Sequence, residues 1–149
     1  MQINNSIKVT GRIKLELFDE SGNLKDTREI NNLVVTAGKN YLATWIAAAS
    51  QAGYFMQYIG LGEGTTPAQS TDTDLETPLS TRVTGTVTSS TNIWQNIASF
   101  GPGVNTGTIT EAGLFSDASS GTMFARQVFG AITKSTGDSL QVTWQVTIS

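Results

Sequence analysis

The sequence contains no cysteine and no histidine among its 149 residues. Without cysteine, the chain has no disulfide bond, no thiolate nucleophile and no cysteine-ligated metal. Without histidine, it lacks the most frequent general base of enzymes and the most frequent ligand of transition metals. No constellation of the remaining side chains is typical of an active site. The sequence therefore predicts a protein that is not an enzyme and that uses no cofactor.

Charged residues are also scarce, at 14% of the chain, against about 25% in an average globular domain. The net charge is -3 and the lysines and arginines form no cluster, which argues against binding to nucleic acid. No apolar run is long enough to cross a membrane. The polar surface consists mainly of threonine, serine, asparagine and glutamine, which another protein can cover without leaving ions unpaired. We therefore expect a homo-oligomer.

The length of the chain predicts one domain spanning residues 1–149. No repeat, low-complexity tract or linker divides it. Its first six residues form a short polar arm without a core pattern of its own: Met1, Gln2, Ile3, Asn4, Asn5 and Ser6. This arm is the natural candidate for contacting a neighbouring subunit or a larger assembly. These six residues are therefore predicted to bind a partner.

The C-terminal part of the chain has the strongest β pattern. In residues 140–148, apolar side chains alternate strictly with polar ones, so one face of a strand is buried and the other exposed. Trp144 lies on the apolar face and is predicted to be a core residue. Two apolar runs, residues 109–115 and 122–129, precede this strand and are joined by short turns rich in serine, glycine and aspartate. We predict that the three strands form an antiparallel meander.

Five further runs predict strands. Alternating patterns cover residues 7–17 and 24–30, the second of which is charged enough to suit an exposed edge. Apolar or threonine-rich runs cover residues 54–61, 82–91 and 93–100. Together with one helix, roughly eight strands favour a mainly β fold, specifically a two-layer antiparallel β-sandwich with a jelly-roll-like arrangement.

The single convincing helix pattern follows Thr36, which is predicted to be its N-cap. Its apolar side chains recur at helical spacing and form one stripe: Tyr41, Leu42, Trp45, Ile46 and Ala49. An aromatic stripe could line a ligand pocket. A helix that closes the open end, or covers one face, of a sandwich explains it better.

Two loops carry candidates for ligand binding. Residues 60–67 contain three glycines at alternate positions, but neither the following helix nor the lysine of a phosphate-binding loop accompanies them. Asp72, Asp74 and Glu76 form the carboxylate cluster of the chain and are weak candidates for binding Ca²⁺. A capping box, with Thr73 at the N-cap and Glu76 three residues later, explains them better. Acid–base chemistry on a glycoside would need a cleft, which the sequence does not indicate.

Four segments carry a resemblance to a known class of proteins. They are residues 32–40 (NLVVTAGKN), 59–67 (IGLGEGTTP), 109–115 (ITEAGLF) and 137–144 (GDSLQVTW). Together they resemble small structural proteins of tailed bacteriophages, and the resemblance spans most of the chain from residue 32 onward. The segment ITEAGLF is also similar to parts of phage tail-fibre and tail-collar proteins.

The resemblance implies assembly into a virion, where proteins of this type are commonly head decoration (cement) proteins or tail components. It implies the phage major capsid protein as the partner, with tail proteins as the alternative. A decoration protein on the surface of the phage head, made in the host cytoplasm, is the favoured interpretation. Because decoration proteins often occupy threefold axes of the shell, the resemblance also favours a homotrimer. It supplies no catalytic residue.

The second hypothesis concerns a different class of function. In it the chain is a β-sandwich that binds or cleaves carbohydrate, as could occur at the tip of a phage fibre. Trp45, Trp94 and Trp144 could offer faces on which sugars stack. However, Trp144 belongs to an apolar strand face and Trp45 to the helix stripe, so both are expected in the core. Trp94 alone remains, and one tryptophan is a poor platform for a sugar.

Overall fold

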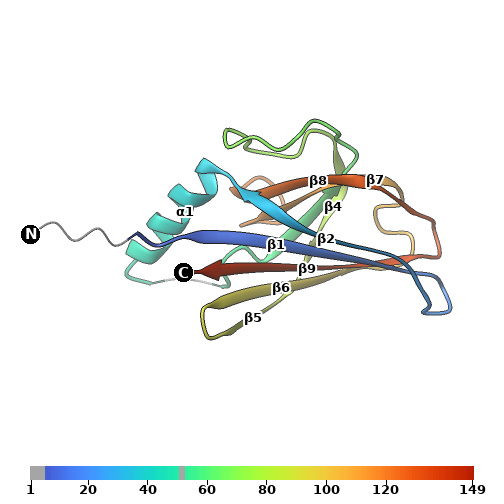
Figure 1. Ribbon diagram of the computed structural model, residues 1–149, viewed down its shortest axis with the longest axis horizontal. Coiled ribbons are helices and arrows are strands. Elements are labelled where there is room, and N and C mark those ends of the chain that lie inside the picture. The colour runs from blue at the N-terminus through green and yellow to red at the C-terminus, as the bar shows by residue number, and fades with distance from the viewer. Residues whose placement is uncertain (1–5, 51–52) are drawn as a thin grey trace, which may run out of the picture.

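The computed structural model describes residues 6–50 and 53–149. Within them the chain forms nine strands and one helix (Figure 1). In chain order these are β1 (Val9–Phe18), β2 (Leu24–Val34), α1 (Thr36–Ala47), β3 (Tyr58–Gly62), β4 (Pro78–Thr84), β5 (Thr86–Ser90), β6 (Ile93–Phe100), β7 (Gly107–Phe115), β8 (Met123–Lys134) and β9 (Ser139–Ile148). The prediction of a mainly β fold with one α-helix is confirmed.

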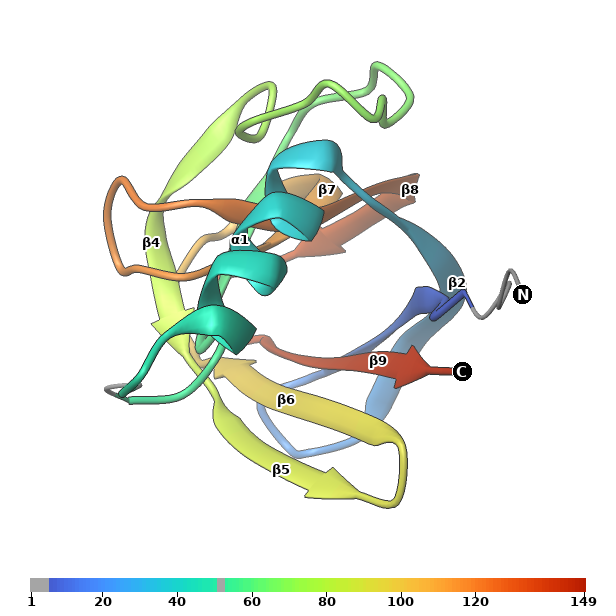
Figure 2. The same cartoon turned by 90° about the vertical axis from the view of Figure 1, so that its left-hand side faces the viewer.

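All nine strands belong to one sheet, in the order β4-β3-β7-β8-β2-β1-β9-β6-β5. Every neighbouring pair is antiparallel. The edge strands β4 and β5 follow each other in the sequence, separated by Gly85, so the sheet curls until it is nearly closed. Figure 2 shows this barrel-like sheet end-on, with α1 lying across the opening that faces the viewer. The predicted two-layer sandwich with a jelly-roll-like arrangement is not confirmed.

The predicted meander of the last three strands is wrong. β7 and β8 form the expected hairpin, but β9 pairs with β1 on one side and with β6 on the other. The turn at residues 135–138 leads the chain from the β7–β8 side of the sheet to the β1–β9 side (Figure 1). The alternating pattern of β9 specifies which of its faces is buried, but it does not specify which strands flank it.

The core is filled by the inward faces of the strands, as the alternation predicts. Trp144 has no exposed surface and lies opposite Ile13 of β1, so its prediction as a core residue is confirmed. The inward residues of these two strands are Ile13, Leu15, Leu17, Leu140, Val142, Trp144 and Val146. By contrast, Ile7, which the pattern placed in the first strand, precedes β1 and is largely exposed.

The region predicted as one strand over residues 82–91 is divided at Gly85. The backbone N–H of Gly85 donates to the carbonyl of Gln57 at 2.9 Å, and a Cβ on Gly85 would lie 1.5 Å from Oδ1 of Asn96. Because of this close approach, only glycine fits at the break between β4 and β5. The predicted strand over residues 54–61 is shorter than expected, since β3 begins at Tyr58.

Helix α1 is positioned by its contact with β8. A Cβ on Gly38 would lie 2.3 Å from the carbonyl oxygen of Phe124, so the helix backbone packs directly against this strand. Thr36 is the first helical residue and not the predicted N-cap; Val35 holds the N-cap position without a side-chain hydrogen bond. The backbone N–H of Thr36 donates instead to the carbonyl of Ser70 at 2.9 Å. A carbonyl group of a distant loop therefore accepts a hydrogen bond from the first turn of the helix, where the hydroxyl of Thr36 was expected to act as the cap.

The apolar stripe of α1 is only half-covered. Tyr41, Leu42 and Trp45 are half-buried against the end of the core, whereas Ile46 keeps 69% of its surface exposed. Ala49 lies beyond the end of the helix. The helix thus covers part of the open end of the sheet, in keeping with the interpretation as a cover.

Candidate functional site

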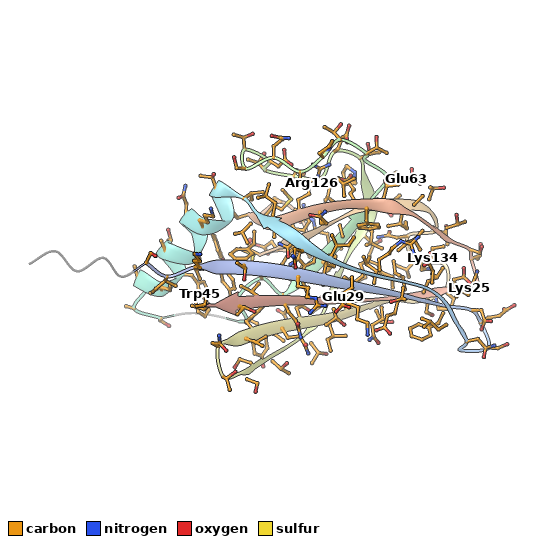
Figure 3. All side chains as sticks on the ribbon, in the orientation of Figure 1. Lys25, Glu29, Trp45, Glu63, Arg126 and Lys134 are labelled. Atoms are coloured by element: carbon orange, nitrogen blue, oxygen red, sulfur yellow. The ribbon has the colours of Figure 1, made fainter. Side chains whose placement is uncertain are left out.

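A buried ion pair joins β7 to β8 beneath the loops at one side of the molecule. Glu111 of β7 has no exposed surface, and Arg126 of β8 has 2%. Arg126 lies opposite Gly113 and therefore diagonal to Glu111 on the same face of the sheet. Its Nε and one terminal nitrogen each lie 2.9 Å from Oε2 of Glu111. Figure 3 shows Arg126 on this side of the molecule.

The carboxylate of Glu111 also binds the backbone of two loops. Its Oε1 accepts hydrogen bonds from the N–H of Gly64 at 3.1 Å and of Thr77 at 2.8 Å. Its Oε2 accepts from the N–H of Glu76 at 3.1 Å. A Cβ on Gly62 or Gly64 would lie 2.4 Å or 2.6 Å from Oε1, so both glycines are needed for the loop to approach the carboxylate.

Arg126 extends this arrangement toward the surface. One terminal nitrogen donates to Oδ2 of Asp72 at 2.8 Å, and the other donates to the carbonyl of Thr66 at 3.1 Å and lies 3.7 Å from Oε2 of Glu76. Burial alone would lower the pKa of Arg126, but the hydrogen bonds to Asp72 and Glu111 outweigh it and raise this pKa above its ordinary value. The guanidinium therefore stays charged. We call Glu111, Arg126, Asp72, Glu76 and Thr66 the Glu111 cluster.

The three carboxylates predicted as weak candidates for a metal site each bind a different partner within the chain. Asp72 pairs with Arg126, while Asp74 lies 3.5 Å from Arg82. Glu76 accepts hydrogen bonds from the backbone and hydroxyl of Thr66, both at 2.8 Å. Among the described residues, no group of three or more metal-ligating side chains is placed to hold a metal ion.

The predicted capping box is wrong, because residues 72–77 form a bent, irregular loop and not a helix. The side chain of Glu76 reaches Thr66 instead of the backbone N–H of Thr73. A hydrogen bond to a charged carboxylate is about twice as strong as one between neutral groups, so cross-loop bonds and a buried arginine outcompete a single turn of helix. Sequence spacing carries no information about these distant partners.

The glycine-rich loop is also explained by the Glu111 cluster. The N–H of Gly64, which a phosphate-binding loop would offer to its ligand, is already bonded to a carboxylate. A phosphate at this position would meet the negative charge of Glu111. The alternate glycines at 62 and 64 therefore serve the internal contact, and the weak phosphate hypothesis loses its basis.

Each residue of the segment ITEAGLF that faces this region has a packing role. The hydroxyl of Thr110 donates to the carbonyl of Gly64 at 2.8 Å. A Cβ on Gly113 would lie 2.8 Å from the ring of Phe115, which leaves no room for a side chain. The guanidinium of Arg82 stacks 3.5 Å from the centre of that ring. This segment, one of the four that carry the phage resemblance, is thus the part of the sheet that holds both loops.

A second buried charge lies near the turn before β9. Lys134 is 1% exposed and its Nζ donates to the carbonyl of Gly101 at 2.9 Å. Burial lowers the pKa of Lys134, and the charge of Asp138 opposes this shift. Asp138 accepts from Nζ of Lys25 at 2.8 Å and from the N–H of Ser135 at 2.9 Å. These bonds attach the turn to β2, and the amine of Lys134 is not accessible to a substrate.

Acid is expected to destabilise the fold. Hydrogen bonds from Thr66 lower the pKa of Glu76 below its ordinary value of 4.5, and the bond from Lys25 lowers the pKa of Asp138 below 3.8. A carboxylate whose pKa is lower in the folded chain than in the unfolded chain stabilises the fold at pH values above the unfolded pKa. This contribution is lost as the pH falls through the folded pKa. We therefore expect the melting temperature to fall as the pH drops below about 4.5. In Asp138→Asn the melting temperature should decrease less over the same pH range. A melting temperature of the unmodified chain that stays constant over this range would contradict the lowered pKa values of Glu76 and Asp138.

The open end beside α1 contains a cavity of about 420 Å³ with mainly apolar walls. Phe55 is one of its lining residues, and the centroid of its ring lies 5.5 Å from that of Trp45, 6.0 Å from that of Trp94 and 5.3 Å from that of Phe124. Trp144 is fully buried and Trp45 and Trp94 are half-buried. No pair of tryptophans therefore presents an open, flat platform for a sugar.

The predicted arm falls mostly outside the described residues. Met1, Gln2, Ile3, Asn4 and Asn5 lie outside them, whereas Ser6 is described and exposed. The start of β1 lies at the α1 end of the molecule (Figure 1), and just before it the N–H of Lys8 donates to the carbonyl of Ser149. The role of the arm in partner binding stays a prediction.

Comparison of the chain with models of protein families, with curated proteins and with solved structures finds no match. Within the described part of the chain, no helix is both long enough and apolar enough to span a bilayer. The geometry of the site is therefore the basis for a functional proposal, together with the resemblance of the four segments.

Proposed function

We propose that this chain is a non-enzymatic structural protein of a bacteriophage virion. Its favoured place is the outside of the head, where it binds the lattice of major capsid protein as a decoration protein and stabilises the shell. The chain acts as a homo-oligomer, with three copies favoured by the phage resemblance. Many copies then share the attachment, so modest affinity per subunit suffices.

The observation that supports a structural role most directly is the use of Glu111 and Arg126. Glu111 accepts hydrogen bonds from three backbone N–H groups and from Arg126, and both side chains are buried. Acid–base catalysis needs a carboxyl group that reaches a substrate. This carboxylate instead holds two loops on a rigid sheet, which suits a surface that must keep one shape while it binds a large particle.

The alternative place is the tail, as a tail, tail-fibre or baseplate component. The similarity of the segment ITEAGLF to tail-fibre and tail-collar proteins favours it. Carbohydrate binding at a fibre tip is the weaker form of this alternative, since Trp94 is half-buried against Phe55. If the protein binds no sugar on a glycan array, carbohydrate binding is excluded.

Images of purified particles that contain and lack the protein test the proposal. We expect additional density over the head lattice in the particles that contain it, and lower resistance of the head to heat in those that lack it. Density on the tail would support the alternative. Absence of the protein from both head and tail of intact particles would contradict a virion role.

Deletion of residues 1–6 is expected to weaken attachment to the particle while the melting temperature of the free protein stays nearly unchanged. The described backbone near this end is bonded from Lys8 onward, through two hydrogen bonds with Ser149, so the deletion removes none of these bonds. Occupancy on particles and the melting temperature are the two measurements. A chain with a glycine–serine segment of equal length in place of the arm is the control for length. Full occupancy after the deletion would show that the arm is not an anchor.

A further inference from the structure

The α1 end of the molecule exposes large apolar side chains. Four of them are found there, with exposed fractions of 77% for Ile7, 69% for Ile46, 62% for Tyr54 and 44% for Ile148. Ile46, Tyr54 and Ile148 line the cavity beside α1, and Ile7 and Ile46 line a second hollow that adjoins it through Leu42. Apolar surface gathered in this way on a soluble protein marks an interaction site.

Positive charge accompanies this apolar surface. Lys8 and Lys39 line the second hollow, and no carboxylate side chain lines either hollow. Within the described part of the chain, neither lysine forms a salt bridge. We call Ile7, Ile46, Tyr54, Ile148, Lys8 and Lys39 the helix end.

The opposite end of the long axis has the complementary character. The β1–β2 hairpin forms this end (Figure 1), and Leu24, at its turn, is 55% exposed. Asp19 and Glu20 precede it in the turn and form no salt bridge within the described residues, whereas Lys25 is paired with Asp138. The carboxylate of Asp19 accepts hydrogen bonds from the backbone N–H groups of Ser21 and Asn23, so it also holds the turn in shape. Figure 3 shows Lys25 and Trp45 at opposite ends of the molecule. We call Asp19, Glu20 and Leu24 the hairpin end.

We propose that copies of this chain associate head to tail, with the hairpin end of one copy bound to the helix end of the next. Leu24 enters the apolar cavity beside α1, and the carboxylates of Asp19 and Glu20 face Lys8 and Lys39. The charge complementarity of the two ends identifies a second copy as the occupant, because an apolar partner without carboxylates would leave both lysines unpaired.

Such a contact is heterologous, since the two surfaces in it differ. Repetition of a heterologous contact closes into a ring when the angle between copies permits, and otherwise grows into a filament. The inference deepens the homo-oligomer of the proposed function by naming its contact surfaces. It does not depend on the particle, because it concerns the purified chain alone.

Sedimentation velocity of the purified protein over a wide range of concentrations tests the contact. We expect the unmodified chain to form larger species as its concentration rises, and Leu24→Asp and Ile46→Asp each to remain monomeric. An equimolar mixture of these two variants should form a dimer that grows no further, because each variant retains the surface that the other has lost. Ala131→Asp, at an exposed apolar position of β8 that lines neither hollow, is the matched control and should associate like the unmodified chain.

Charge reversal provides a second test at positions where misfolding is not expected, since Glu20 and Lys39 are exposed. Glu20→Lys and Lys39→Glu should each weaken the association about two- to fivefold, the effect of losing one exposed ion pair. Added salt should also weaken it.

Three outcomes would overturn the proposal. They are a monomer at every concentration, a mixture of the two variants that fails to form a dimer, and a dimer of the unmodified chain that grows no further. Intact self-association in a chain that is absent from particles would contradict the virion proposal and leave this contact in place.

Discussion

Replacement of Glu111 by alanine is expected to lower the free energy of unfolding by about 3–5 kcal/mol, the cost of removing one partner from a buried ion pair. The change leaves the buried guanidinium of Arg126 without its fully buried carboxylate partner, and it leaves three backbone N–H groups without an acceptor. Urea unfolding followed by circular dichroism measures the loss.

Glu29→Ala is the matched control, because Glu29 also pairs with an arginine but does so at the surface. Arg12 lies 2.6 Å from Glu29, and the two side chains are 54% and 47% exposed. Surface pairs of this kind contribute about 0–1 kcal/mol. A similar loss in the two variants would show that Glu111 does not hold the loops as described.

The same substitution should also have a local effect. Residues 63–77 are held to the sheet through Glu111, so their release should increase amide exchange in this segment before the sheet unfolds. Arg126→Lys should release the segment in part, since an ammonium cannot reproduce the forked contacts with Glu111 and Asp72. Unchanged amide exchange of residues 63–77 in both variants would show that contacts other than those of Glu111 and Arg126 hold the loops.

Trp144→Ala is expected to cost about 3–5 kcal/mol through the cavity that it leaves in the core. Trp144 is fully buried between Ile13 of β1 and Asn96 of β6. A loss of this size approaches the whole stability of many domains, so soluble yield and melting temperature should both fall.

Trp144→Phe separates packing from hydrogen bonding at this position. The indole N–H has no hydrogen-bond partner among the described residues, so phenylalanine removes volume but no hydrogen bond. We expect it to cost clearly less than alanine. An equal cost for both substitutions would mean that the indole nitrogen is bonded, for example through a buried water.

The faces of the strands were predictable from the sequence, whereas their neighbours were not. Alternation in β9 and β1 identifies the buried residues, because side chains of a strand point to opposite faces in turn. The same alternation fits any pair of neighbouring strands, so it gave the wrong partner for β9. The break at Gly85 was also hidden, because its cause is the side chain of Asn96 on another strand.

The Glu111 cluster was predictable only in part. The glycines at 62 and 64 and the carboxylates of Asp72 and Glu76 were visible as motifs, but their common partner was not. Arg126 gave the one available signal: a lone arginine within an apolar strand has to find a buried carboxylate. The sequence could not identify that carboxylate as Glu111, because the pairing of β7 with β8 sets the geometry.

The place of β9 in the sheet determines when the protein can be completed during synthesis. β9 lies between β1 and β6, yet it is the last of the strands to leave the ribosome. Until then β1 and β6 each have one unpaired edge, and the apolar row of β1 has no neighbour on that side. The β7–β8 hairpin can form on the nascent chain, but the two parts of the sheet that meet at β9 cannot. A chain truncated before residue 139 therefore loses the connection between these parts, and with it the nearly closed shape of the sheet.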